Sequence, residues 1–236
     1  MKLDPLLSII IPTWNEDSCI DATLTLLQPI RQWSEIIVVD AGSKDSTQDI
    51  ARPLADLVIT SKKGRAVQMN AGVNCANGEY LLFLHADTQM PLATQSALFT
   101  VLKKTPVWGR FDIALSEQTI ILQIVATSMN WRSRLTGIAT GDQGIFVQQP
   151  QFTAIGQFPN IALMEDIAIS RKLRKVSRPT CITQPLITSS RRWESAGSMA
   201  TIMLMWRLRL QYFFGTDPEK LAHIYQSHNS KCNAHD

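Results

Sequence analysis

The first half of the chain alternates between short apolar runs and longer segments whose polar positions recur at helical spacing. The apolar runs predict strands at residues 6–11, 35–40, 57–60 and 80–84. Turn and capping residues bound the segments between them, which predicts helices at 17–30, 45–54, 64–76 and 91–104. Strands that alternate with helices of this length usually form a parallel sheet, so the pattern predicts an α/β fold.

The second half of the chain has a less regular pattern. Its apolar runs predict strands at 107–115, 144–147 and 181–187, and its amphipathic segments predict helices at 117–135, 164–175, 196–214 and 218–226. Residues 227–236 are predicted to form a flexible tail. No linker or internal repeat interrupts the pattern, so residues 1–226 are predicted to form a single domain.

Composition narrows the class of protein. Apolar residues make up 45% of the chain and charged residues 18%, as in an ordinary folded protein, and the net charge of +3 is too small to indicate nucleic-acid binding. The four cysteines are far apart and show no C-x-x-C spacing, so neither a zinc site nor a disulfide framework is predicted. There is no signal-peptide pattern and no apolar run of membrane-spanning length, so a cytoplasmic location is predicted.

Polar side chains follow the first two predicted strands. Asn15 and Glu16 come after the first strand, and Asp40 ends the second. Ligands of open α/β sheets bind beyond the carboxyl ends of the strands, so these acceptors are expected to face one crevice. A ligand rich in hydrogen-bond donors, such as a nucleoside, fits this arrangement.

Two further segments carry groups suited to a diphosphate. Lys63, Gly64 and Arg65 stand at a predicted helix start, where the dipole and free N–H groups favour an anion; an exposed, solubilising turn is the alternative. His85 and Asp87 directly follow an apolar strand, and alternation along an extended chain places both on one side. They are predicted to face a Mg²⁺ or Mn²⁺ ion, unless Asp87 only caps the next turn.

The second half offers candidates for catalysis and acceptor binding. Glu165 and Asp166 begin a predicted helix, where they either complement the helix dipole or supply a general base. Residues with turn-forming or anion-binding chemistry occur in two other segments: Gly141, Asp142 and Gln143, and then Arg191, Arg192 and Trp193.

Two helical segments are unusually apolar, at 119–125 and 199–214. Thr201, Arg207 and Arg209 interrupt the second. Core packing or a homodimer interface explains such segments, and an interfacial helix that lies on a membrane near a lipid-linked acceptor is the alternative.

In this order, the segments resemble the family 2 glycosyltransferases of GT-A fold, a three-layer α/β/α architecture. The matching residues are 11–16 (Ile-Pro-Thr-Trp-Asn-Glu), 39–47 (Val-Asp-Ala-Gly-Ser-Lys-Asp-Ser-Thr), 85–88 (His-Ala-Asp-Thr) and 165–166 (Glu-Asp). The segments 64–72, 141–143 and 191–193 look like those of a small bacterial subgroup associated with radical-SAM and selenium-related genes. The resemblance extends over residues 7–225.

The resemblance implies a role for each matching residue. Pro12, Thr13 and Glu16 would line the nucleoside pocket and Asp40 would bond the base. Lys63 and Arg65 would lie near the nucleoside or phosphate of a UDP- or GDP-sugar, and Asp87 would hold the divalent metal. Asp166 would be the catalytic base of an inverting transfer to a hydroxyl acceptor. Residues 1–105 would then be the donor half and 106–226 the acceptor half.

The sequence departs from the family pattern at two positions. His85 stands where the metal motif usually has an acidic residue, which leaves open whether His85 itself is a ligand. Ser189 stands where processive members have glutamine, and no membrane-spanning helix is predicted, so a single transfer is expected.

Two other classes of function remain as alternatives. One is a nucleotide-sugar-binding or membrane-docking protein without turnover, although the retained Glu165 and Asp166 argue against it. The other is a sugar nucleotidyltransferase, which would be expected to carry a glycine- and arginine-rich loop near the N-terminus. A dinucleotide oxidoreductase is disfavoured because no G-x-G-x-x-G follows the first strand. In the membrane-docking alternative the chain would lie peripherally at the inner face of a membrane.

Overall fold

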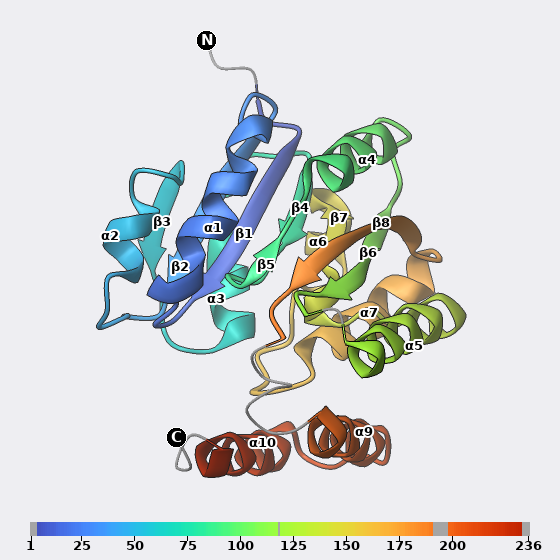
Figure 1. The fold of residues 1–236 in the computed structure, drawn as a ribbon. Coiled ribbons are helices and arrows are strands. Elements are labelled where there is room, and N and C mark those ends of the chain that lie inside the picture. The colour runs from blue at the N-terminus through green and yellow to red at the C-terminus, as the bar shows by residue number, and fades with distance from the viewer. Residues whose placement is uncertain (1–3, 118, 191–197, 233–236) are drawn as a thin grey trace.

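The computed structural model describes residues 4–117, 119–190 and 198–232, and in this part of the chain an eight-stranded sheet has helices on both faces (Figure 1). The strand order is β3-β2-β1-β4-β7-β6-β8-β5. The strands are β1 (Leu7–Thr13), β2 (Ser34–Asp40), β3 (Leu57–Thr60), β4 (Tyr80–Phe83), β5 (Thr88–Gln89), β6 (Trp108–Leu115), β7 (Ile145–Gln148) and β8 (Thr180–Thr188).

The first four strands in the sheet order are parallel, as the alternating pattern predicted. Their register places Thr13, the last residue of β1, beside Asp40, the last residue of β2. The second half adds strands of mixed direction: β7 pairs antiparallel with both β4 and β6, while β6 and β8 are parallel. The carboxyl ends of β1, β2 and β4 therefore share one edge of the sheet. Strands from the second half of the chain extend the sheet beyond β4.

Helices cover both faces of the sheet, which gives three layers. On one face lie α1 (Asp17–Leu27), α2 (Thr47–Ala51) and α4 (Leu92–Leu102). On the other lie α3 (Arg65–Val73), α6 (Gln149–Ala154) and α7 (Glu165–Val176). The remaining helices are α5 (Ile120–Thr136), α9 (Ser198–Phe213) and α10 (Pro218–Cys232), and the short 3-10 helices are η1 (Gln28–Ile30) and η2 (Gly141–Gln143).

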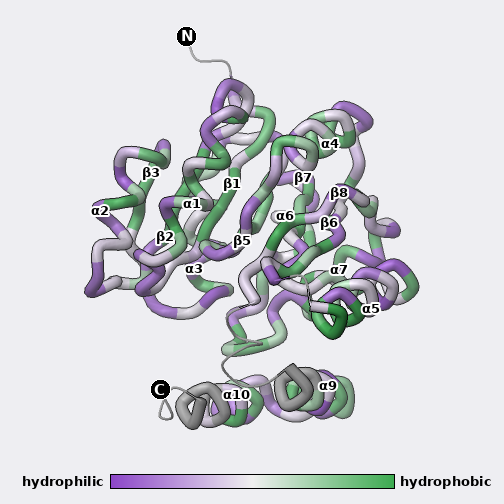
Figure 2. Tube along the Cα trace, viewed as in Figure 1, coloured by the Kyte–Doolittle hydropathy of each residue, from purple (hydrophilic) through white to green (hydrophobic). Residues whose placement is uncertain are grey.

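Side-chain alternation in the central strands divides the core between these layers. Ile9 and Ile11 of β1 pack into the cluster under α1 and α4, whereas Ile10 packs into the cluster under α3 and α7. All three are fully buried, and Figure 2 shows β1 as a continuous hydrophobic strand. A strand buried on both faces reads as an unbroken apolar run, which explains why the sequence pattern identified it.

The C-terminal helices lie beyond the carboxyl edge of the sheet, below the strands in Figure 1. Leu208 of α9 and Leu221 of α10 pack against Met164 and Ile167 at the start of α7. α9 and α10 are thus attached to the element that carries Glu165 and Asp166. No helix in the described part of the chain is long and apolar enough to cross a membrane.

Three features differ from the sequence-based expectation. α10 continues to Cys232, so residues 227–232 are helical where the sequence pattern had ended the helix at residue 226; no glycine or proline interrupts this helix. The pattern also missed β5 and α6, which are two and six residues long and too short for a periodic signal.

Candidate active site

The loops after β1 and β2 are tied together around Asp40. This carboxylate is fully buried and accepts hydrogen bonds from the backbone N–H of Gly42 (2.9 Å) and Ser43 (2.8 Å), from Gln48 Nε2 (2.7 Å) and from Thr13 Oγ1 (3.1 Å). Burial alone would raise the pKa of Asp40, but the hydrogen bonds from Ser43, Gln48 and Thr13 outweigh it and lower the pKa. In this structure Asp40 organises the loop. To contact the nucleobase of a ligand, Asp40 would have to give up one of these hydrogen-bond partners.

Replacing Asp40 with asparagine is expected to lower the free energy of unfolding at pH 7 by about 1–3 kcal/mol, because buried donors lose their acceptor. A carboxyl whose folded pKa is depressed stabilises the fold above its unfolded pKa, about 3.9, and that contribution is lost as pH falls through the folded value. The deficit of the variant should therefore shrink below about pH 4. Urea denaturation of both proteins across this range measures it, and a pH-independent deficit would contradict the assignment.

The other predicted nucleoside residues lie at the end of β1 and just after it. Thr13 is buried, whereas Pro12 and Glu16 are half-buried, and Glu16 accepts a hydrogen bond from Cys19 Sγ at 3.2 Å. The exposed Lys63 places its ammonium over the ring of Trp14. This cation therefore lies next to the loop that follows β1.

Arg65 links the first half of the chain to the second. It is the first residue of α3, after Gly64, whose positive φ of 141° is accessible to glycine. Arg65 Nη1 lies 3.3 Å from Glu165 Oε1, a contact between residues one hundred positions apart. The Arg65 side chain is 40% exposed; such burial as it has opposes its charge, but the carboxylates of Glu165, Asp166 and Asp142 raise its pKa.

Glu165 and Asp166 occupy different environments although they are neighbours. Glu165 is only 2% exposed, and burial raises its pKa against the opposing charge of Arg65. Asp166 is half-buried, and its Oδ2 accepts a hydrogen bond from Gly141 N at 2.9 Å. Since adjacent carboxylates with different surroundings can divide their roles, Glu165 holds Arg65 and Asp166 remains available to the cavity.

His85 and Asp87 lie at the end of β4, but not in the extended conformation that the sequence suggested. Ala86 and Asp87 form a turn, and Thr88 N donates a hydrogen bond to His85 O at 3.1 Å. The argument from alternation is therefore wrong, although both side chains still line one cavity. The turn forms because β5 must reverse to pair antiparallel with β8.

The corner around Asp87 suits a metal ion that is shared with a nucleotide. His85 Nδ1 lies 3.3 Å from Asp142 Oδ1, and a Cβ at Gly141 would come within 2.5 Å of His85 Nε2. The imidazole is thus covered on both nitrogens, which favours Asp87 over His85 as the ligand. Among the residues that the structure describes, no group of three or more His, Cys, Asp or Glu side chains could hold a metal alone. Mg²⁺ commonly takes one or two carboxylates together with substrate phosphates and water, so this donor set fits.

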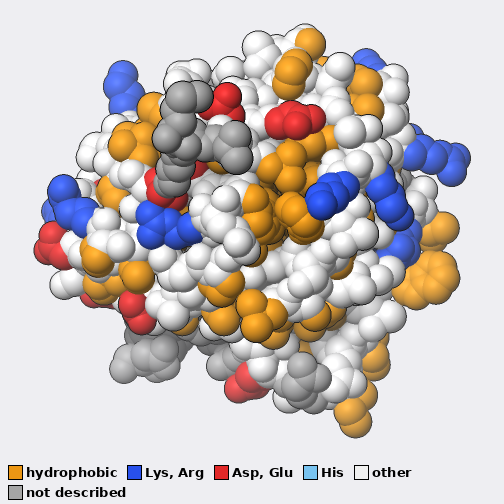
Figure 3. All heavy atoms as spheres, turned by 90° about the horizontal axis from the view of Figure 1, so that it is seen from above, with side chains coloured by type: hydrophobic (Ala, Val, Ile, Leu, Met, Phe, Trp, Pro, Cys, Tyr) orange, Lys and Arg blue, Asp and Glu red, His pale blue; other side chains and the backbone are white. Residues whose placement is uncertain are grey.

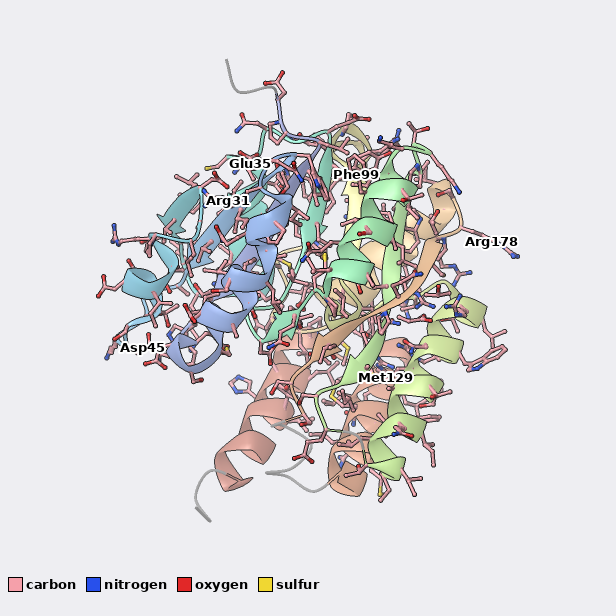
Figure 4. The ribbon with its side chains drawn as sticks, turned by 45° about the horizontal axis from the view of Figure 1, so that its top comes forward. Arg31, Glu35, Asp45, Phe99, Met129 and Arg178 are labelled. Atoms are coloured by element: carbon pink, nitrogen blue, oxygen red, sulfur yellow. The ribbon has the colours of Figure 1, made fainter. Side chains whose placement is uncertain are left out.

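These groups converge on a cavity of about 290 Å³. It contains seven of the residues predicted from sequence: Arg65, His85, Asp87, Gly141, Asp142, Glu165 and Asp166. Helices α5, α9 and α10 contribute a further part of its wall, including Met129 of α5, which Figure 4 labels, and Tyr225 of α10. The predicted nucleoside residues Pro12, Thr13, Glu16, Asp40 and Lys63 are not part of its lining.

The substrate role predicted for Gln143 does not fit the structure. Its side chain is fully buried; Oε1 accepts from Thr140 N at 3.2 Å and Nε2 donates to Ser133 Oγ at 2.9 Å. Gln143 thus shapes the turn that carries Gly141 and Asp142. Arg191, Arg192 and Trp193 lie outside the described residues.

Two arginines that the sequence did not single out as site residues lie near Asp166. Arg209 of α9 lines the cavity, and its Nε is buried without a hydrogen-bond partner, as are Nε and Nη2 of Arg132 on α5. Burial and the charge of Arg209 lower the pKa of Arg132 to about 10. Burial also lowers the pKa of Arg209, although Asp166 and Asp142 oppose this. In the sequence, the only indication of a role for Arg209 was its charge within the apolar segment 199–214.

Comparison with known protein families shows which family the chain belongs to. A family model described as glycosyl transferase family 2 matches residues 8–155, more than half of the chain. The chain belongs to this family. The predicted family membership is thereby confirmed.

The chain is also similar to individual proteins, both in sequence and in structure. A PGL/p-HBAD biosynthesis glycosyltransferase of Mycobacterium bovis is 40% identical over 96 residues, which are 36% of this chain and 37% of the relative. Structurally, the chain resembles Staphylococcus aureus TarS in complex with UDP-GlcNAc, with TM-score 0.64, 19% identity, and coverage of 78% of this chain and 58% of TarS. It also resembles the mannosyltransferase PcManGT of Pyrobaculum calidifontis in complex with GDP-Man and Mn²⁺, with TM-score 0.63, 21% identity, and coverage of 93% and 68%.

These structural likenesses confirm the predicted GT-A fold, with its mainly parallel sheet. The match to the Mycobacterium relative covers only about a third of that protein's length, 37%.

Proposed function

We infer that this family 2 glycosyltransferase moves a sugar from a nucleoside-diphosphate sugar to a hydroxyl group in one displacement, with inversion. The observation that carries the proposal is the cavity itself, which brings Asp166, Asp87 and Arg65 together from three separate segments. Known complexes of similar fold support it, since TarS binds UDP-GlcNAc and PcManGT binds GDP-Man with Mn²⁺.

Asp166 is the proposed general base. Its Oδ2 is oriented by the hydrogen bond from Gly141 N, and Asp166 lies in the first turn of α7 and lines the cavity. The acceptor oxygen attacks the anomeric carbon, the bond from that carbon to the diphosphate breaks, and the acceptor proton passes to Asp166.

The leaving diphosphate gains negative charge, and this chain offers cations near the place where that charge would develop. Arg65 and Arg209 both line the cavity, and Asp87 is the proposed ligand of a Mg²⁺ or Mn²⁺ ion. Such an ion, when bound, would neutralise diphosphate charge. Lys63 and the loops of Thr13, Glu16 and Asp40 would hold the nucleoside beyond it.

Nucleoside diphosphates are expected to stabilise the full chain against heat, because a ligand that binds only the folded state raises the melting temperature. Melting should be followed with UDP, GDP, ADP or CDP, each with and without Mn²⁺. We expect UDP or GDP to raise the melting temperature further when Mn²⁺ is present. If none of the four nucleotides shifts it, the proposed donor site is wrong.

A further inference from the structure

Two helices carry large apolar side chains on their solvent-exposed sides. On α5, Ile120 is 77% and Leu135 80% exposed; on α9, Trp206 is 72% and Phe213 70% exposed. The full set, here called the α5–α9 apolar face, is Ile120, Ile121, Ile124, Trp131, Leu135, Met203, Trp206, Leu210, Phe213 and Phe214.

Helical spacing places the members of each helix on one side. Ile120, Ile124, Trp131 and Leu135 follow each other at intervals of four, seven and four residues, so they form one stripe along α5. The opposite side of α5 is also apolar, since Leu122 is buried against the protein. An exposed apolar stripe of this kind, on the side of the helix that the protein does not cover, marks an interaction surface.

The two stripes meet at the mouth of the cavity. Ile124 of α5 and Trp206 of α9 are both exposed and both line it, together with Asp166 and Arg209. The cavity that holds the proposed base therefore opens through the α5–α9 apolar face.

The charges on these helices are of one sign. α5 contains Arg132 and Arg134, α9 contains Arg207 and Arg209, and neither helix contains an aspartate or glutamate. Arg207 is exposed and Arg134 is partly exposed in an ion pair with Asp112, whereas Arg132 and Arg209 have buried nitrogens beside the cavity. Figure 3, which views the face far from α9 and α10, shows hydrophobic side chains mixed with charges of both signs. Aromatic and aliphatic side chains combined with arginines, without acids, are typical of helices that lie in the interface of an anionic membrane.

A second copy of this chain fits the surface less well. A two-fold interface brings the same patch of both copies together, so the exposed Arg207 of each copy would lie near its own kind, and neither α5 nor α9 offers an acidic residue to pair with it.

We propose that the α5–α9 apolar face docks on the surface of an anionic membrane, with the mouth of the cavity turned toward the lipid. The acceptor is then a lipid-anchored molecule whose hydroxyl enters the cavity from the membrane. This statement about the acceptor rests on the proposed function, whereas the docking does not.

Sedimentation with vesicles tests the docking. The full chain should bind vesicles of phosphatidylcholine mixed with phosphatidylglycerol more tightly than vesicles of phosphatidylcholine alone, and added salt should weaken the difference. Combining Ile120→Asp with Phe213→Asp should weaken binding at least about tenfold, since two apolar groups can no longer enter the interface. Leu92→Asp is the matched control, because Leu92 is exposed and, like Ile120, is the first residue of its helix.

Brominated lipids test which face touches the membrane. They should quench the tryptophan fluorescence of the bound protein, and Trp131→Phe combined with Trp206→Phe should remove most of the quenching. Trp14→Phe is the control, since Trp14 is exposed in the loop after β1. Quenching that survives the double substitution would overturn the proposed orientation.

Other results would also overturn the docking: no binding to mixed vesicles, or equal binding of the two-aspartate variant and wild type. One pattern of results would identify a second copy of the chain as the partner of the α5–α9 apolar face. In that pattern the wild type dimerises in sedimentation velocity, the two-aspartate variant is monomeric, and neither protein binds vesicles. Stabilisation by UDP with Mn²⁺ is measured on every variant. If it persists without vesicle binding, only the docking fails; if vesicles bind and no nucleotide stabilises the chain, the proposed function fails and with it the assignment of the acceptor.

Discussion

Asp166→Asn is expected to abolish sugar transfer and to leave nucleotide binding in place. An amide cannot take the proton of the attacking hydroxyl, but its oxygen can still accept the hydrogen bond from Gly141 N. Loss of a general base typically lowers the rate by about 10²–10⁴-fold. The measurement is the rate of nucleoside-diphosphate release from a nucleotide sugar, together with the melting shift that UDP or GDP produces.

Asp49→Asn is a suitable control for this substitution. Asp49 is exposed and lies in the first turn of α2, as Asp166 lies in the first turn of α7, so both variants lose a similar interaction with a helix dipole. The control should retain full activity. Undiminished turnover in Asp166→Asn would remove Asp166 from the role of base.

Asp87→Ala should eliminate the contribution of the metal to nucleotide binding. Asp87 is the carboxylate at the end of β4 that lines the cavity, and the covered imidazole of His85 is poorly placed to replace it. In the wild type, Mn²⁺ should increase the melting shift caused by UDP or GDP; in the variant, the shift should be the same with and without Mn²⁺. Turnover should fall at least about a hundredfold, since the charge of the leaving diphosphate is no longer neutralised.

Asp21→Ala provides the comparison, because Asp21 is exposed on α1 and lies outside the cavity lining. If Asp87→Ala keeps the full Mn²⁺-dependent shift, the metal binds elsewhere. The combined His85→Ala and Asp87→Ala variant then shows whether His85 had taken over as the ligand.

The donor half of the fold was largely predictable from the sequence. β1 and β2 are buried on both faces, and this burial produces the continuous apolar runs that identify them. The sequence could not reveal that β7 inserts antiparallel between β4 and β6, because strand order depends on contacts between distant segments. The extension of α10 to Cys232 was missed because residues 227–232 carry almost no apolar side chains, so no hydrophobic periodicity marks the helix there.

The cavity lining was predictable where polar residues directly follow a predicted strand or begin a predicted helix. Asp87 and Asp166 both line the cavity, as their positions at the ends of predicted elements suggested. The turn at Ala86 was not predictable, because it depends on the pairing of β5 with β8. The burial of Gln143 depends on Ser133, ten positions earlier on α5, and no local pattern carries such a contact.

Arg209 shows the opposite case. A charge inside an apolar helix was visible in the sequence, but its place beside Asp166 follows from the packing of α9 against the start of α7. Its buried, unpaired Nε marks a position where a ligand oxygen would be stabilised.

The central claim is that the cavity at the carboxyl edge of the sheet performs sugar transfer. The most direct measurement incubates the wild type and Asp166→Asn with a panel of UDP- and GDP-sugars and Mn²⁺, and follows release of the nucleoside diphosphate. The account predicts Mn²⁺-dependent release from at least one donor by the wild type and almost none by the variant, which still binds the nucleotide. Water takes the place of the acceptor hydroxyl in this measurement, and release that is equal in both proteins would contradict the account.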